Sequence, residues 1–307
     1  MTARPQWMAG ACVLLGPTAS GKSSLGLPIA ESAGAIVVAV DSMQVYRGLD
    51  IGTAKPTPAD RRRVRHAGVD IAGPNEDVTL VRYVKSVDDD LRDWQGPTLM
   101  IAGTGLHLRA LIDRLKPPGE WPDLRAEFEA SSDLGALYAR LQLLDALAAS
   151  RIDPGNRRRI VRALEVSVGS GLPFSTFGPG LNAYPEIDIV QFGLRWERSA
   201  LTRRIDARVD AMLAGGWLEE VRALHRAAMS RTSRQALGYR ELIDHLDGRI
   251  TLPDAVATIK LRTRQFAIRQ ERWFRRDPRI RWIDMTDDGP DPSDQISRAV
   301  RGSRWVR

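Results

Sequence analysis

The sequence is poor in the residue types that cross-link chains or bind transition metals. It contains one cysteine, Cys12, and four histidines among 307 residues. A single cysteine excludes an intramolecular disulfide, and the scattered histidines do not reach the spacing of a zinc site. The 43% hydrophobic and 27% charged residues are typical of a soluble globular protein.

Long apolar runs are also absent. No run of about eighteen apolar residues exists, so a transmembrane helix is not expected. The N-terminal segment MTARPQWMAGACVLLG lacks the apolar stretch of a signal peptide. We therefore expect a cytoplasmic protein with no membrane partner. A monomer is expected as well.

The charge is unbalanced toward arginine. Lys and Arg number 45 against 38 acidic residues, which gives a net charge of +7. Arginine suits bidentate contacts with phosphate, but an arginine-rich composition is equally well explained by a GC-rich genome. The charge alone therefore does not identify a nucleic acid as the partner.

Three short apolar runs predict the strands of a parallel sheet. They cover residues 11–15, 36–40 and 98–102, and they show no alternation of polar and apolar positions. Such runs are typical of strands buried on both faces. Helical patterns at residues 23–33 and 81–94 lie between them. The alternation of strand and helix predicts an α/β fold with a doubly wound parallel sheet.

The pattern changes at Pro117, where several prolines and glycines interrupt the chain. Two helical stretches follow at residues 134–149 and 156–168, without a strand between them, and a loop rich in Gly and Pro covers residues 169–185. We interpret this region as a helical insertion domain, residues 117–185, within a discontinuous core made of residues 1–116 and 186–307.

The second part of the core should be mostly helical. A returning strand is expected at residues 187–194 and a short edge element at 281–283. The tail after Asp287 is polar and is expected to be loosely ordered. Long helices are expected at residues 199–229, 235–247 and 253–276.

A complete phosphate-binding motif follows the first strand. Residues 16–23 read GPTASGKS, which matches G-x-x-x-x-G-K-[ST] between a predicted strand and a predicted helix. In such a P-loop, backbone N–H groups and the helix N-terminus surround an anion. Lys22 adds a charge for the outer phosphate, and the Ser23 hydroxyl is a candidate Mg²⁺ ligand. The diphosphate site comprises Gly16, Pro17, Thr18, Ala19, Ser20, Gly21, Lys22 and Ser23.

An acidic residue, Asp41, directly follows the second strand. The carboxyl ends of parallel strands meet at the ligand crevice, so Asp41 should lie across from the P-loop. It could orient a hydroxyl or Mg²⁺ as in a small-molecule kinase, or act as a general base, or cap the next turn. The third strand ends in Ala102-Gly-Thr-Gly105 and lacks the acid found there in many ATPases.

Six blocks in order along the chain resemble the tRNA dimethylallyltransferases, also called isopentenyltransferases. The longest is DSMQVYRGLDIGTAKPT, residues 41–57, which is similar to the signature of that family. The others are GPTASGKS at 16–23, AGTGLHLRAL at 102–111, RRIVRALEV at 158–166, QALGYRE at 235–241 and TRQFAIRQERWFRR at 263–276.

The resemblance implies a specific reaction. The P-loop would hold dimethylallyl diphosphate with Mg²⁺, and the acceptor would be N6 of the adenosine on the 3′ side of the anticodon, position 37. This P-loop NTPase-like prenyltransferase would have to flip the adenine out of the anticodon loop. Asp41 would accept the N6 proton, and Thr18 and Arg208 would contact the departing diphosphate. The residues expected at tRNA are Asp41, Ser42, Met43, Gln44, Thr104, Arg125, Arg158, Arg159, Ile160, Val161, Arg162, Gln235, Gly238, Tyr239 and Arg240.

Some positions depart from the family pattern. His107 stands where the family usually has Tyr, Asn156 belongs to a Gly-Asn pair in place of Asn-Asp, and Ala67 replaces a second His or an Arg. Two alternative functions would account for only part of these observations. One is a P-loop kinase of a small metabolite or nucleoside, and the other is an RNA-binding protein without catalysis.

Overall fold

The computed structural model describes residues 4–115, 117–177, 183–287 and 289–302. Contacts divide the chain into two compact units, one made of Met1–Arg114 with Glu186–Arg307 and the other of Leu115–Pro185. Part of the Gly- and Pro-rich loop 169–185 lies outside the described residues. Within the described part of the chain, no helix is long and apolar enough to span a bilayer.

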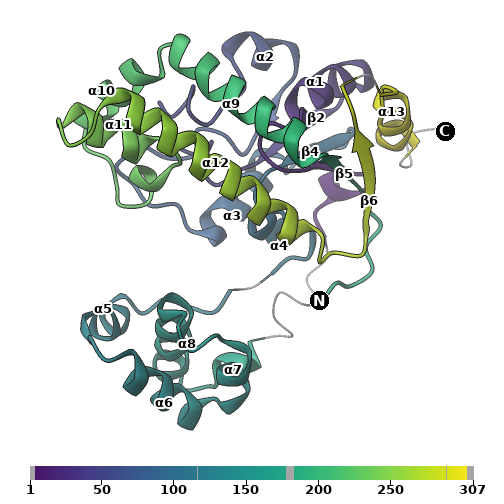
Figure 1. Ribbon diagram of the computed structural model, residues 1–307. Helices are drawn as coiled ribbons and strands as arrows, with labels where there is room; N and C mark the ends of the chain where they lie inside the picture. The colour runs from purple at the N-terminus through teal and green to yellow at the C-terminus, as the bar shows by residue number, and fades with distance from the viewer. Residues whose placement is uncertain (1–3, 116, 178–182, 288, 303–307) are drawn as a thin grey trace. The chain divides into compact units, whose positions relative to one another are not determined.

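The first unit contains one parallel sheet with the strand order β3-β2-β4-β1-β5-β6 (Figure 1). All five strand pairs that form this sheet are parallel. The predicted α/β fold class is therefore confirmed. The strands are β1 Cys12–Leu15, β2 Ile36–Val40, β3 His66–Ala67, β4 Thr98–Ala102, β5 Val190–Trp196 and β6 Ile280–Met285.

Helices cover both faces of the sheet, which explains why its strands read as continuous apolar runs. On one face, alternate strand residues such as Leu14 pack against α1 and α13, the latter through Ile296 and Val300. On the other face, residues such as Val13 and Val38 belong to the larger cluster, to which α3, α4, α10, α11 and α12 contribute. The helices of this unit are α1 Lys22–Ala33, α2 Pro58–Arg63, α3 Leu80–Asp90, α4 Gly105–Ile112, α9 Arg198–Ala214, α10 Trp217–Arg226, α11 Tyr239–Leu246, α12 Leu252–Phe274 and α13 Ser293–Gly302.

Two expectations about the C-terminal half were wrong. The single helix expected over residues 199–229 is two helices, because Gly216 adopts a φ of 95° that L-residues rarely tolerate. The turn allows Trp217 to enter the core. The tail after Asp287 is not loosely ordered throughout, since α13 packs on α1 (Figure 1). Its Ile296 and Val300 side chains are fully buried.

The second unit is a small helical bundle. It consists of α5 Pro122–Ala130, α6 Leu134–Leu144, α7 Ala146–Arg151 and α8 Arg157–Ser170. The helix expected over residues 134–149 breaks at Asp145, whose carboxylate accepts the Ala148 N–H at 2.9 Å and so begins α7. The core of this unit is formed by Phe128, Leu137, Leu141, Ile160, Val161 and Leu164.

Candidate active site

The P-loop is a tight turn between β1 and α1, and it is supported from outside. The Trp196 indole donates a hydrogen bond to the Ser20 carbonyl at 3.0 Å, and Arg204 Nε donates one to the Ala19 carbonyl at 3.0 Å. At Gly16 a side chain has no room, because a Cβ would lie 2.9 Å from the Leu194 carbonyl oxygen. The loop is therefore held by neighbouring elements in a shape that can receive an anion.

Two cationic side chains face the space enclosed by the P-loop. Lys22 Nζ donates to the Pro17 carbonyl at 2.7 Å. Burial, together with the nearby Arg208 charge, lowers the pKa of Lys22 to about 7, while Asp41 acts in the opposite direction. Burial also lowers the pKa of Arg208, which comes from α9. Cations held together in a partly dry site are favourable only when an anion joins them, so this pair suits an anionic ligand.

Asp41 is fixed by a turn at the end of β2. Its Oδ1 accepts the N–H of Met43 at 2.8 Å and that of Gln44 at 3.4 Å. The other oxygen, Oδ2, lies beside Gly103 at the end of β4, where an added Cβ would be 3.3 Å away. One carboxylate oxygen therefore builds the turn, and the other lies beside the end of β4.

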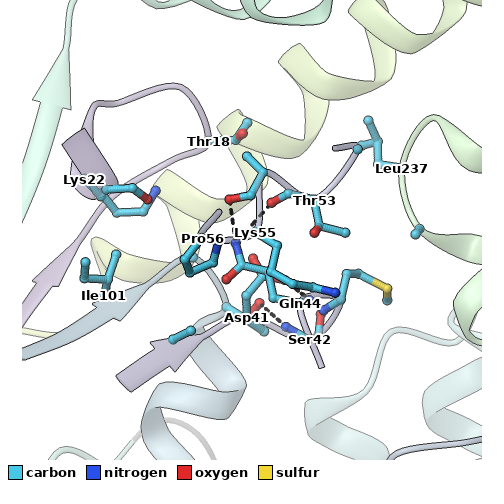
Figure 2. Close-up of a pocket in the computed structure, with 18 of the residues that line it drawn as sticks. Thr18, Lys22, Asp41, Ser42, Gln44, Thr53, Lys55, Pro56, Ile101 and Leu237 are labelled. Carbon is cyan, nitrogen blue, oxygen red and sulfur yellow. Dashed lines mark hydrogen bonds between the residues drawn. The ribbon is translucent and has the colours of Figure 1, made fainter. Parts of the chain in front are cut away.

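A pocket of about 560 Å³ joins these groups. In Figure 2, Asp41 lies between Lys22 and Ile101 on one side and Leu237 on the other. The polar lining includes Thr18, Lys22, Ser23, Asp41, Ser42, Gln44, Thr104, Arg208 and Gln235, and the apolar lining includes Leu27, Val37, Met43, Ile101, Met212, Trp217 and Leu237.

The loop after Asp41 forms one wall of the pocket and is anchored by two charged side chains. Lys55 is buried and binds the Tyr46 carbonyl at 2.6 Å as well as the carboxylates of Asp50 and Asp70. Glu220 of α10 accepts three successive backbone N–H groups, those of residues 50, 51 and 52. Each of these contacts satisfies a backbone or side-chain polar group of the loop, so together they hold the wall in place.

The structure brings most of the expected core-unit residues together. Thr18, Lys22, Ser23, Asp41, Ser42, Met43, Gln44, Thr104, Arg208 and Gln235 all line the one pocket. The lining does not include Gly238, Tyr239 or Arg240, nor the P-loop residues Gly16, Pro17, Ala19, Ser20 and Gly21. Tyr239 is fully buried and donates its hydroxyl to Glu220 at 2.6 Å, so its side chain belongs to the core, whereas Arg240 is exposed.

The remaining expected residues belong to the helical unit. Ile160 and Val161 are buried in its core, which makes packing and not ligand contact their role in this structure. Arg158 and Arg159, by contrast, are exposed. Arg125 and Arg162 both pair with the fully buried carboxylate of Glu165, at 2.9 and 2.8 Å, and keep 37% and 27% of their side-chain surface exposed. The unit therefore presents ordered arginines to solvent.

Sequence reasoning missed the contribution of α12 to the pocket. Thr263, Phe266, Arg269 and Gln270 line it. Their spacing of three, four and seven residues places them on one helical face. That spacing was visible in the sequence, but residues 263–276 were used there only as a block of family resemblance, without a role at the site.

His107, which departs from the family pattern, lies close to the site. Its ring meets the Tyr83 ring edge-on, with centroids 4.8 Å apart, and its buried Nδ1 has no hydrogen-bond partner. Burial lowers the pKa of His107 to about 4, although the Asp41 charge opposes this shift. His107 is therefore a neutral packing residue at neutral pH.

A divalent metal would depend on the ligand for most of its coordination. In the segments that the structure describes, no group of three or more His, Cys, Asp or Glu residues could hold a metal ion. The Ser23 side chain is exposed at the pocket. Mg²⁺ is commonly held by few protein ligands together with substrate phosphates, and Ser23 fits that arrangement.

The fold and the P-loop, residues 16–23, together define a P-loop α/β protein with an acid opposite its anion site. A family model described as IPP transferase matches residues 44–277, and one described as isopentenyl transferase matches residues 9–69. The chain belongs to the IPP transferase family. The resemblance seen in the sequence is confirmed.

Individual relatives match over nearly the whole chain. A tRNA dimethylallyltransferase of Symbiobacterium thermophilum is 40% identical over 95% of both chains. Another, of Pelotomaculum thermopropionicum, is 40% identical over 94% of this chain and 96% of its own. The crystal structure of a tRNA isopentenylpyrophosphate transferase from Bacillus halodurans is 34% identical, covers 95% and 96% of the two chains, and superposes with a TM-score of 0.66.

Proposed function

We propose that this protein transfers a dimethylallyl group from dimethylallyl diphosphate to N6 of the adenosine on the 3′ side of the anticodon in tRNA. The observation that carries the proposal is the shared pocket, which holds the P-loop cations and the Asp41 carboxylate together. The names of the relatives support the choice of tRNA as acceptor and of a dimethylallyl donor.

Different residues act on the leaving group and on the nucleophile of this reaction. The bond between the prenyl C1 and the diphosphate oxygen breaks as the bond between C1 and N6 forms. Lys22, Arg208 and the P-loop at Thr18 stabilise the negative charge that develops on the departing diphosphate. Asp41 accepts the proton that N6 loses, because its Oδ2 is not used in the turn.

Mg²⁺ has a defined place in this proposal. The Ser23 hydroxyl and the oxygens of the donor diphosphate would hold the ion. When bound, it would neutralise charge on the diphosphate and so make it a better leaving group.

The tRNA must deliver its adenine to Asp41. Flipping a base out of a loop costs a few kcal/mol, and contacts elsewhere must offset that cost. We assign backbone contacts with the anticodon stem-loop to Arg125, Arg158, Arg159 and Arg162 of the helical unit, residues 117–185. Contacts near the base are assigned to Ser42, Met43, Gln44, Thr104, Gln235 and Arg240, of which all except Arg240 line the pocket.

The direct test uses unmodified anticodon stem-loop RNA, isotope-labelled dimethylallyl diphosphate and Mg²⁺. Mass spectrometry of the nucleosides should detect N6-(dimethylallyl)adenosine, and an RNA with guanosine at the acceptor position should remain unmodified. If the labelled group does not enter RNA, the proposal is wrong. Release of ADP from ATP with a small acceptor would instead identify a kinase.

A further inference from the structure

Gln270 lies on the pocket face of α12 and connects two strand ends of the sheet. Only 8% of its surface is exposed. Its Oε1 accepts the backbone N–H of Thr18 in the P-loop at 2.9 Å. Its Nε2 donates to the backbone carbonyl of Gly103, after β4, at 2.7 Å. A single amide thus bridges the loop after β1 and the loop after β4.

The end of β4 is also where the Asp41 carboxylate sits. A Cβ added to Gly103 would lie 3.3 Å from Asp41 Oδ2 and 3.6 Å from Gln270 Nε2, so both groups are on the same side of this glycine. Gly103 and Thr104 donate their N–H groups to the Val40 carbonyl, directly before Asp41, at 3.1 and 3.2 Å. The position of β4's end is therefore coupled to that of the carboxylate.

The two partners of Gln270 require an amide. Thr18 offers a donor, and Gly103 offers an acceptor. Among side chains of this length, a neutral amide or a protonated carboxyl can satisfy both, whereas an ionised carboxylate can only accept. An ionised carboxylate would also face the Gly103 carbonyl oxygen without a proton between them, which is unfavourable in a buried site.

We propose that Gln270 is a positioning residue that sets the separation between the donor diphosphate and the Asp41 carboxylate. It binds Thr18 of the P-loop through its Oε1 and Gly103 beside the carboxylate through its Nε2. This inference rests on the proposed prenyl transfer, since it assigns a role within that reaction. Displacement of reacting groups by about 1 Å can cost on the order of 10²-fold in rate.

Two substitutions separate positioning from packing. Gln270→Leu keeps the volume and removes both bonds. We expect kcat to fall about 10- to 100-fold, with the KM for dimethylallyl diphosphate changed less than about threefold, because Lys22 and most of the cradle still bind the anion. The matched control is Gln265→Leu on the exposed side of the same helix, which should retain wild-type kcat and KM.

Gln270→Glu should give a pH-dependent loss of kcat, which a packing role alone would not produce. A protonated glutamic acid can accept from Thr18 and donate to Gly103, but the ionised form cannot. The ratio of wild-type to Gln270→Glu kcat should therefore be small at about pH 5.5 and increase toward about pH 8, because buried carboxyl groups titrate in this range. The same ratio for Gln270→Leu should not depend on pH.

The outcomes distinguish the inference from the function on which it rests. If the wild-type protein does not transfer the prenyl group, the proposed function fails. If the wild type is active and Gln270→Leu keeps its kcat, or if both variants show the same pH dependence, Gln270 does not position these groups. Thermal unfolding of each variant establishes that the assay temperature lies below its transition.

Discussion

Replacement of Asp41 by asparagine tests the assignment of the general base with little disturbance of the loop that carries it. In the structure, Asp41 Oδ1 accepts the N–H groups of Met43 and Gln44. The asparagine carbonyl can accept the same two bonds, whereas its NH₂ group cannot take a proton from adenine N6. The substitution therefore removes the proposed chemistry and keeps the turn.

The expected magnitude follows from these contacts. Loss of a general base costs about 10²- to 10⁴-fold in rate, which corresponds to about 3–5 kcal/mol in activation free energy. Asp41→Ala would in addition remove the acceptor of two backbone donors, at about 0.5–1.5 kcal/mol of unfolding free energy for each hydrogen bond lost. Asp41→Asn should therefore unfold close to the wild-type temperature, and Asp41→Ala below it.

Single-turnover kinetics with enzyme in excess over labelled stem-loop RNA measures the chemical step, and fluorescence anisotropy of the same RNA measures binding. We expect the Asp41→Asn rate constant to fall by the factor given above while RNA affinity stays within about threefold. A rate constant within about fivefold of wild type would refute the role of Asp41. Loss of RNA binding in proportion to rate would also refute it, since the residue would then act in binding.

Three further predictions concern the cradle, the loop wall and the helical unit. The pKa of Lys22 is lowered to about 7 in the free protein, so the binding of dimethylallyl diphosphate at about pH 8 should take up close to one proton and should weaken as pH rises. Calorimetry in two buffers of different ionisation enthalpy measures this proton uptake. Equal binding heats in the two buffers would contradict it. Glu220→Ala removes the acceptor of three backbone N–H groups of the loop and should lower the free energy of unfolding by about 2–4 kcal/mol. Urea unfolding measures this change, and an unchanged urea midpoint would show that the loop does not need Glu220. Arg158→Ala should reduce the salt dependence of RNA binding by about one phosphate contact without altering stability, because its side chain is exposed. Ile160→Ala should instead lower the free energy of unfolding by about 2–5 kcal/mol, because its side chain is fully buried. Loss of stability in Arg158→Ala together with unchanged stability in Ile160→Ala would contradict both assignments.

Local patterns in the sequence were sufficient for the parallel sheet and for the two groups at its edge. The runs at 11–15, 36–40 and 98–102 contain the strands β1, β2 and β4, because a strand buried on both faces leaves a continuous apolar signal. Gly16–Ser23 and Asp41 follow two such strands directly. Parallel strands bring their carboxyl ends to one edge, so the shared pocket followed from their places in the chain.

Other elements depended on signals that the sequence carries weakly. The break at Gly216 was overlooked, because glycine within a long helical pattern does not by itself reveal a left-handed φ. The helix α13 was overlooked because its apolar positions are few, and only docking on α1 makes it stable. The burial of Ile160, Val161 and Tyr239 was also hidden by motifs that surround them with exposed arginines.

The sequence by itself determined the α/β class, the family resemblance and the chemical types present at the site, because these rest on local periodicity and on residues adjacent in the chain. Only the tertiary structure decided which side chains hold the site in shape. Gln270 meets Thr18 across 252 positions, and Glu220 meets the loop at residue 50 across 170. Such contacts depend on the docking of helices onto the sheet, and no local pattern encodes the distance between residues so far apart.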